Sequence, residues 1–287
     1  VENSQLSRSR PLFRQFLAAM NPPWNRNGIR GVWLPEPGEN IEKLHETAKL
    51  AEKSPSSTLI KTSARSRIVR AEIGGMDVII KRFIHDTPSR RWKYLCRVSQ
   101  GRRACAAART LLEVGLPTPD PCGFFEVRRN GLPVESYLLT RRIEGADEAR
   151  KWLRPYFHRQ PEDLRQQIRT ELLELLLNLY RNGIYHSDTK SRNMLLRAPV
   201  DSANRAWFWI DLEGMKFGVR PNRHMITRNL VQLNGSLGSK ISDEDRLAFL
   251  HDMAKTYPWL AEPNVEEDIR AWTLQRLERE LRREERP

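Results

Sequence analysis

Short runs of β-branched and aromatic residues alternate with turn residues between Thr58 and Thr140. The runs are Leu59-Ile60, Ile68-Val69, Val78-Ile79-Ile80, residues 124–127 and residues 137–140. Val, Ile, Phe and Tyr favour strands. Gly74-Gly75 and Asn130-Gly131 supply the positive φ angles of tight hairpin turns. The pattern predicts a five-stranded sheet in this part of the chain.

Helical spacing replaces this pattern further along the chain. Leucines cover much of the circumference of residues 164–180, which predicts a buried central helix. An alanine-rich helix is expected over residues 101–114, between the third and fourth strands. Residues 268–287 place Trp272, Leu277 and Leu281 at helical spacing among acids and arginines. We expect this terminal helix to pack on the protein and not to bind a membrane.

Residues 1–57 have a different composition and are expected to form an N-terminal extension that packs on the rest of the protein. Prolines at positions 22, 23, 35 and 37 predict loops, with a short helix at either end. The second of these helices is expected from residue 41 to Lys53, where Ser54-Pro55 stops it. Trp24 and Trp33 are expected to pack against a neighbouring lobe.

Composition describes a globular protein with an excess of positive charge. Of 287 residues, 39% are hydrophobic and 30% charged, and no run approaches the roughly 20 apolar residues of a membrane span. The three cysteines have no metal-ligand spacing, which favours buried thiols in a reducing cytoplasm. The net charge of +13 indicates an anionic partner. Charge alone does not choose among nucleic acid, a membrane face and an anionic substrate.

One stretch carries the side chains of a recognisable chemistry. It runs Asn182-Gly-Ile-Tyr-His-Ser-Asp-Thr-Lys-Ser-Arg-Asn-Met-Leu-Leu196, and the aromatic run 207–209 then leads to Asp211-Leu-Glu-Gly214. Gly183 can end the leucine-rich helix in a left-handed cap. Phosphoryl transfer needs a carboxylate that orients the attacking hydroxyl, an amide and a second carboxylate on Mg²⁺, and a lysine that offsets charge on the moving group. Asp188, Asn193, Asp211 and Lys190 are the matching side chains.

The same residues resemble a protein-kinase-type catalytic loop followed by an Asp-x-Gly magnesium motif. The chain is more closely similar to the bacterial lipopolysaccharide kinases, the Kdo and heptose kinase family. Four further segments carry this resemblance: Leu111-Leu-Glu-Val-Gly-Leu-Pro-Thr-Pro119, Ser136-Tyr-Leu-Leu-Thr140, Arg228-Asn-Leu-Val-Gln-Leu233 and Asp245-Arg-Leu-Ala-Phe-Leu250. The resemblance covers roughly residues 58 to 260.

The resemblance implies a nucleotide site with two departures from the kinase pattern. Lys81 ends the third strand, where the fold places the lysine for the α- and β-phosphates. Arg142 and Ile143 lie in the expected hinge, whose backbone receives an adenine ring. The candidate phosphate loop, residues 62–67, has no glycine, so Arg65 and Arg67 are candidate phosphate ligands.

The second departure is the partner of the strand lysine. The helix expected to supply a glutamate offers alanines and a cysteine at positions 104–108. Glu113 lies near the helix end, in poor geometry. The ion pair is either missing or supplied from elsewhere, with Glu72 on the second strand as a candidate.

The segment after Asp211 is basic. Residues 215–228 hold four fixed cations and no acid: Lys216, Arg220, Arg223 and Arg228. In a kinase fold this segment borders the acceptor site, next to carboxylates that would repel an anion. We expect these four side chains to bind an anionic acceptor. The alternative is that they only solvate a surface or pair with acids from elsewhere in the fold.

We therefore expect an α+β, bilobal protein-kinase-like fold, with a small β-rich N-lobe and a larger, mainly helical C-lobe. Residues 1–57 would be the extension, residues 58–141 the nucleotide-binding N-lobe, and residues 142–287 the catalytic and acceptor-binding C-lobe. His186 is expected to be structural, because this chemistry needs no imidazole.

Function follows from the resemblance. The chain would transfer the γ-phosphate of ATP, with Mg²⁺, to a Kdo or heptose hydroxyl of the lipopolysaccharide inner core. The expected partners are ATP and an anionic glycolipid, with peripheral contact at the cytoplasmic membrane face and no nucleic acid. Two alternatives stay open. One is a kinase of the same fold that acts on a protein or small metabolite, and the other is a pseudokinase that binds nucleotide or a partner.

Overall fold

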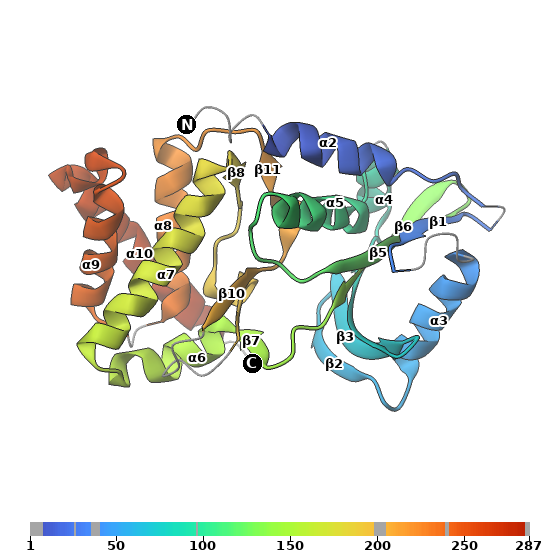
Figure 1. The fold of residues 1–287 in the computed structure, drawn as a ribbon, viewed down its shortest axis with the longest axis horizontal. Coiled ribbons are helices and arrows are strands. Elements are labelled where there is room, and N and C mark those ends of the chain that lie inside the picture. The colour runs from blue at the N-terminus through green and yellow to red at the C-terminus, as the bar shows by residue number, and fades with distance from the viewer. Residues whose placement is uncertain are drawn as a thin grey trace. The chain divides into compact units, whose positions relative to one another are not determined.

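The computed structural model describes residues 8–25, 27–35, 41–95, 97–197, 205–238 and 241–284. Within this part, the chain forms two compact units (Figure 1). Residues 9–143 and 211–213 form one, here called the sheet unit. Residues 144–210 and 214–287 form the other, here called the helical unit.

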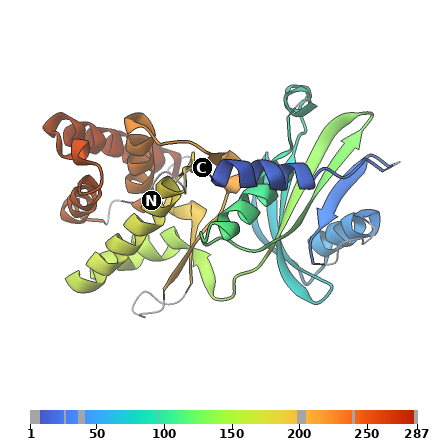
Figure 2. The same ribbon diagram turned by 45° about the horizontal axis from the view of Figure 1, so that its top comes forward.

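The sheet unit is built on a six-stranded antiparallel sheet with the strand order β1-β5-β6-β4-β3-β2. Its strands are β1 (Ile29–Trp33), β2 (Thr58–Thr62), β3 (Ser66–Ile73), β4 (Met76–Ile84), β5 (Pro121–Arg129) and β6 (Leu132–Arg141). Its helices are α2 (Ser9–Ala19), α3 (Ile41–Lys53), α4 (Pro88–Leu95) and α5 (Gln100–Glu113). The five strands predicted from the pattern are β2 to β6. Figures 1 and 2 show α2 lying along α5.

The sequence analysis did not predict strand β1, which lies in the expected N-terminal extension. It pairs with β5 at the sheet edge, and Trp33 is buried in the core that α3 covers. The five residues Ile-Arg-Gly-Val-Trp are too short and too mixed to show a period-2 pattern, so only pairing with β5 defines them. Trp24 lies between two guanidinium groups, those of Arg30 and Arg128, at 4.2 and 4.4 Å from the ring centroid.

Strand β4 divides its side chains between the two faces of the sheet. Successive side chains of a strand point to opposite faces. Ile80 belongs to the core that includes Leu44 of α3, and Arg82 on the same face approaches Glu52 of α3. Lys81 therefore lies on the opposite face of the sheet. This strand thus fixes where the lysine ammonium can reach.

The helical unit consists of five helices with two small sheets among its described residues. The helices are α6 (Ala149–Tyr156), α7 (Glu162–Arg181), α8 (Arg223–Leu237), α9 (Asp243–Ala254) and α10 (Pro263–Glu284). The strands are β7 (Ala146–Glu148), β8 (Ile184–Tyr185), β9 (Met194–Arg197), β10 (Ala206–Trp209) and β11 (Lys216–Phe217). They pair as β10-β9-β7 and β11-β8, all antiparallel. Single turns of 3₁₀ helix are η1 (Phe157–Arg159), η2 (Ser191–Asn193), η3 (Leu212–Gly214) and η4 (Pro258–Ala261).

Helix α7 confirms the predicted buried central helix. Leucines at positions 172, 173, 175, 176, 177 and 179 are all buried. The chain turns after the helix at Gly183, whose φ is +65°. A side chain would be strained there, so glycine suits this position, as the sequence predicted.

The terminal helix is present but packs differently from the prediction. Ile269 and Thr273 of α10 are buried, whereas Trp272 is 44% exposed. Gly235 of α8 is the reason, because a Cβ there would meet the side chain of Arg276. The close approach of α8 selects a face of α10 that the apolar spacing did not identify.

Two cysteines in the sheet unit confirm the expectation of buried thiols. Cys105 and Cys122 are free and buried, and burial raises their pKa values to about 12 and about 11. Such thiols stay protonated and unreactive at neutral pH. Cys96 lies outside the described residues.

Candidate active site

The catalytic loop, residues 186–193, connects β8 to β9 in the helical unit. The Asp188 carboxylate faces the Lys190 ammonium at 2.8 Å and accepts a hydrogen bond from Asn193 Nδ2 at 3.0 Å. The guanidinium of Arg192 lies 3.8 Å away. The structure therefore brings together the three loop residues predicted from the sequence. Arg192 is a second cation at the same carboxylate and was not predicted.

His186 fixes the loop by two backbone hydrogen bonds. Its Nδ1 accepts from the N–H of Asp188, and its Nε2 lies 3.1 Å from the carbonyl oxygen of Ile210. One partner is a donor and the other an acceptor, so the ring is the neutral tautomer with the proton on Nε2. The bonds fit the expected structural role. They also tie the loop to the residue that precedes Asp211.

Polar side chains of α8 hold the rest of the loop. We call Asn229, Gln232 and Ser236 the α8 polar seam. Asn229 Nδ2 donates to the His186 carbonyl at 2.9 Å, and its Oδ1 accepts from the buried hydroxyl of Tyr180 at 2.8 Å. Asn229 is fully buried, so each of these bonds replaces water that the group cannot reach.

Gln232 and Ser236 continue the seam along the helix. Gln232 donates to the Ser187 carbonyl at 3.0 Å and accepts from the Thr189 N–H at 3.0 Å. Ser236 Oγ accepts from the Ser191 N–H at 2.8 Å. The sequence analysis missed these residues as loop supports. Their signal in the sequence is the spacing of three and four residues between these polar side chains, which places them on one face of the helix.

Lys81 is the centre of a charge cluster in the sheet unit. Its ammonium forms an ion pair with Asp211 and lies 2.9 and 3.2 Å from the two carboxylate oxygens of Glu213. The lysine side chain is 13% exposed and that of Glu213 is 20% exposed. We call Lys81, Asp211 and Glu213 the lysine cluster. The strand lysine thus has a glutamate partner, which the sequence analysis did not identify.

Electrostatics within the lysine cluster keep the charges paired. Burial lowers the pKa of Lys81, but the two carboxylates outweigh it, so the net shift is upward. Burial raises the pKa of Glu213, opposed by the charge of Lys81 and reinforced by that of Asp211. One ammonium is therefore shared by two carboxylates that repel each other.

The backbone of Asp211 holds the cluster in an uncommon conformation. Its φ is +66°, in the left-handed region that non-glycine residues rarely adopt. Asp and Asn tolerate this region better than other residues with side chains, and such positions are frequent at functional sites. The conformation turns the chain straight into η3, so Asp211 and Glu213 both reach Lys81.

Neither partner considered for Lys81 from the sequence is correct. Ala104 to Ala108 of α5 are fully or almost fully buried, with no acid among them. Glu72 is exposed and sits opposite Asp77 in the β3–β4 register, whereas Lys81 sits opposite Ile68. Glu213 was overlooked because it stands inside the expected magnesium motif, where only Asp211 and Gly214 were assigned.

The candidate phosphate loop is a tight turn between β2 and β3. The hydroxyl of Ser63 accepts from the backbone N–H groups of Arg65 and Ser66, at 3.2 and 3.1 Å. These bonds shape the turn without glycine. Arg67 lies 3.3 Å from the carboxylate of Glu52, so one of the two candidate phosphate ligands has an acidic partner.

The expected hinge follows β6. Arg142 donates its backbone N–H to the Asp77 carbonyl at 3.0 Å, and its guanidinium pairs with the Asp77 carboxylate at 3.2 Å. These contacts fix the start of the segment on β4. Ile143 is half-buried and follows directly.

The four basic residues after Asp211 are exposed but do not share one environment. Arg223 pairs with Glu262 at 3.2 Å and lies over the Trp259 ring. Lys216 lies 5.8 Å from the centroid of the Tyr185 ring. Arg220 and Arg228 are exposed as well, and Arg228 acts on Tyr185, whose pKa is raised by burial and lowered by this charge. For Arg223, the alternative of pairing with an acid from elsewhere in the fold is therefore observed.

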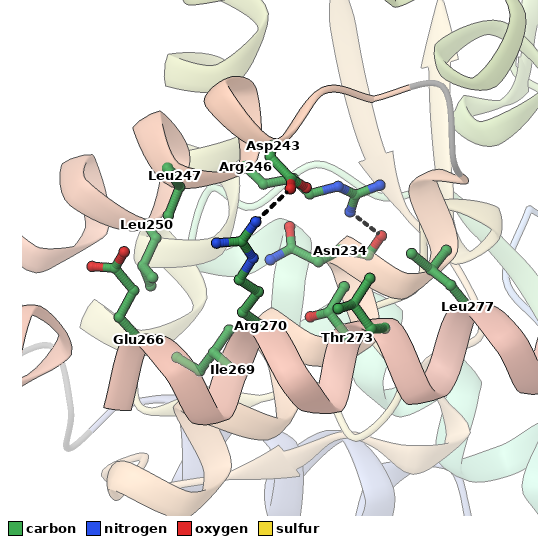
Figure 3. A pocket seen from close by; sticks show the side chains of 11 residues that line it. Asn234, Asp243, Arg246, Leu247, Leu250, Glu266, Ile269, Arg270, Thr273 and Leu277 are labelled. Carbon is green, nitrogen blue, oxygen red and sulfur yellow. Dashed lines mark hydrogen bonds and ion pairs between the residues drawn. The ribbon is translucent and has the colours of Figure 1, made fainter. Parts of the chain in front are cut away.

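A pocket opens elsewhere in the helical unit, between α8, α9 and α10 (Figure 3). Leu247, Leu250, Ile269 and Leu277 line it, with the Arg270–Asp243 ion pair at 2.8 Å on its rim. None of the predicted site residues lines it.

The predicted metal ligands, Asn193 and Asp211, are an amide and a carboxylate. Asn193 Nδ2 donates twice to Asp188, at 2.8 and 3.0 Å, so the amide oxygen of Asn193 is directed away from that carboxylate. An amide oxygen and a carboxylate are the ligands that Mg²⁺ prefers. The N–H of Ile210, which precedes Asp211, donates to the Asn193 carbonyl at 3.0 Å.

The comparisons identify the class of protein. Residues 76–252 match the model of the lipopolysaccharide kinase (Kdo/WaaP) family, and the chain belongs to this family. The catalytic loop, the lysine cluster and the α8 polar seam all lie inside the matched residues. The resemblance seen in the sequence is confirmed.

One solved structure is similar over most of the chain. It is described as WaaP in complex with acyl carrier protein, and it matches with a TM-score of 0.60 and 19% identity. The match covers 87% of this chain and 98% of that one. The fold is thus kinase-like and mixed α/β, with a multi-stranded antiparallel sheet. No curated protein sequence matches the chain. Among the helices of the described residues, none has the length and apolar character to cross a membrane.

Proposed function

We propose that the chain is an ATP-dependent kinase that phosphorylates a sugar hydroxyl, Kdo or heptose, of the lipopolysaccharide inner core. The arrangement of Asp188, Lys190 and Asn193 carries the proposal, because the side chains of Lys190 and Asn193 converge on the Asp188 carboxylate. Family membership supports the lipopolysaccharide acceptor. The bilobal organisation, with a nucleotide-binding N-lobe and a catalytic C-lobe, belongs to this proposal.

Each loop residue has a role that its contacts support. Asp188 orients the acceptor hydroxyl and accepts its proton. Lys190, 2.8 Å from that carboxylate, offsets negative charge on the transferred phosphoryl group. The contacts of this carboxylate with Lys190 and Asn193 hold it in place before the acceptor binds.

The nucleotide contacts come from the sheet unit. Lys81 binds the α- and β-phosphates, with Arg65 and Arg67 as further phosphate ligands and the backbone of Arg142 and Ile143 at the adenine. Asn193 and Asp211 hold Mg²⁺. The metal, when bound, offsets charge on the phosphates and on the moving phosphoryl group.

The acceptor is proposed to be anionic and membrane-borne. The chain carries a net charge of +13, and Lys216, Arg220, Arg223 and Arg228 are exposed cations after the magnesium motif. Peripheral contact with the cytoplasmic face of the inner membrane would bring the enzyme to such an acceptor. Acyl carrier protein is a second partner to test, because the similar solved structure is described as a complex with it.

Mass spectrometry of the lipopolysaccharide core tests the function directly. Core from cells that lack the gene should lose one phosphate, and the wild-type gene should restore it. Asp188→Asn should not restore it. A core that is identical with and without the gene would rule out this acceptor.

Nucleotide binding, phosphoryl transfer and the identity of the acceptor together separate the pseudokinase and other kinases from this proposal. Millimolar Mg²⁺-ATP should raise the melting temperature, since a ligand that binds only the folded state stabilises it. Binding without any phosphoryl transfer would support the pseudokinase. Transfer to a protein or small metabolite, with an unchanged core, would support another kinase of this fold.

A further inference from the structure

The partner of Lys81 must change when the proposed site binds its ligands. In the structure the ammonium is shared by Asp211 and Glu213. The proposed function assigns Asp211 to Mg²⁺. A carboxylate that coordinates a metal attracts an ammonium less strongly, so Glu213 becomes the stronger acidic partner of Lys81.

Glu213 has the geometry to be that partner. Both of its oxygens lie within 3.2 Å of the Lys81 ammonium. The position is well anchored, because Leu212, between the two acids, is buried at 4% exposure. Gly214 ends the turn where a Cβ would meet the Ser187 hydroxyl. The turn can therefore hold the glutamate while Asp211 changes partners.

We propose that Glu213 is a positioning residue, which holds Lys81 for the nucleotide phosphates in place of a helix glutamate. This inference rests on the proposed function. Helix α5 supplies alanines where such a glutamate would stand, and Glu72 lies opposite Asp77, four positions along β4 from Lys81. The positioning residue Glu213 and the proposed metal ligand Asp211 are then two residues apart on one turn. Ordering that turn prepares both contacts at once.

The direction in which ATP affinity changes when Glu213 is removed distinguishes a positioning role from charge repulsion alone. A carboxylate close to bound ATP repels the phosphates, so removing it should strengthen binding if charge alone matters. If Glu213 positions Lys81, its removal should weaken binding, because Lys81 is then paired with Asp211 only. The two explanations predict opposite signs.

Calorimetric titration of ATP into the full chain tests this, with EDTA in one series and Mg²⁺ in the other. Glu213→Gln should weaken ATP binding about tenfold in both series, the size of a lost hydrogen bond to a charged group. Asp211→Asn should bind ATP equally well or more tightly in EDTA and more weakly in Mg²⁺. Glu213→Asp should restore part of the lost affinity.

Glu72→Gln is the matched control, since it removes an exposed glutamate of the same unit that does not contact Lys81. It should bind ATP like the wild type. Melting of each variant without nucleotide reports on folding. A Glu213→Gln protein that is folded and binds ATP equally or more tightly in EDTA would overturn the positioning role. A wild type that binds no ATP in either series would overturn the proposed function, and this inference with it.

Discussion

The two charge-bearing regions of the molecule are held in place by different kinds of interaction. The catalytic loop is fixed by neutral hydrogen bonds, from His186 and the α8 polar seam to backbone atoms. The lysine cluster is held by ion pairs, with one ammonium between two carboxylates. Neutral bonds to a buried backbone leave few alternative arrangements. Shared charges can exchange partners when a ligand arrives.

The difference indicates that the catalytic loop and the lysine cluster have different roles. In the proposed function the loop is preorganised, so Asp188 and Lys190 would need little movement before the reaction. The lysine cluster is a resting arrangement in which protein carboxylates take the place that the proposed phosphates and metal would fill. Predictions that attack each region separately can break or sharpen this comparison.

The largest effect is expected from Asp188→Asn. The substitution keeps the shape and loses the proton acceptor, so turnover should fall by about 10² to 10⁴. ATP affinity should hardly change, because no nucleotide contact is removed. Steady-state kinetics with the lipopolysaccharide acceptor, together with ATP titration, give the two values. Near wild-type turnover would show that the loop is wrongly assigned.

The second effect is expected from Gln232→Leu in the α8 polar seam. It leaves the Thr189 N–H and the Ser187 carbonyl without this partner, at a cost of about 1 to 3 kcal/mol for each buried group. The free energy of unfolding should fall by about 2 to 6 kcal/mol, measured in urea. The catalytic constant of the folded protein should also fall.

His224→Ala is the control for this substitution, because His224 is an exposed residue at the start of the same helix. Its stability and turnover should match the wild type. If Gln232→Leu lowers stability but leaves the catalytic constant unchanged, the seam supports the fold and does not preorganise the loop. The comparison would then lose its first half.

The sequence predicted which loop residues lie together better than it predicted their surroundings. Asp188, Lys190 and Asn193 lie within eight residues, so local spacing is enough to bring them together. Five of the six strands in the main sheet of the sheet unit were likewise predicted from β-branched runs and hairpin turns. These features depend on neighbours along the chain, where pattern reasoning is strongest.

Features that depend on distant residues were missed. Lys81 and Glu213 are 132 positions apart, and no local pattern predicts their pairing. The seam residue Gln232 contacts Ser187 across 45 positions. Strand β1 exists only through its pairing with β5, and the buried face of α10 is set by the approach of α8 at Gly235. Domain roles and individual site residues stay predictions.

A moderate effect is expected from the basic residues after Asp211. Neutralising Lys216, Arg220 and Arg228 together should raise the acceptor KM and leave the ATP KM unchanged, because uniform binding is lost. Acceptor affinity should weaken as salt rises, since exposed charges act over about 8 Å at physiological ionic strength. Arg223→Gln should have a smaller effect, because Arg223 is already paired with Glu262. An acceptor KM that no substitution changes would leave these cations as solvated surface.

The smallest effect concerns pH, and it should be confined to the sheet unit. His45 of α3 is 3% exposed, and its buried Nε2 has no hydrogen-bond partner among the described residues. Burial lowers its pKa from 6.5 to about 4, helped by the charges of Lys49 and Arg82 and opposed by Glu135. The unfolded chain therefore binds a proton at higher pH than the folded chain does. Stability that is present above about pH 6.5 should be lost as the pH falls towards 4, by about 2 kcal/mol at pH 4.5.

Urea unfolding of wild type and His45→Phe at pH 7.5 and 4.5 measures this contribution. Phenylalanine keeps an aromatic ring against Phe125 and Tyr137, whose centroids lie 6.0 and 5.5 Å from that of His45. Carboxylates also titrate in this range. The informative quantity is therefore the difference between the two proteins in how much unfolding free energy is lost between pH 7.5 and 4.5. His158→Gln, at an exposed site, should keep the full wild-type loss. Equal losses in wild type and His45→Phe would mean that the buried imidazole does not set the acid sensitivity of the sheet unit.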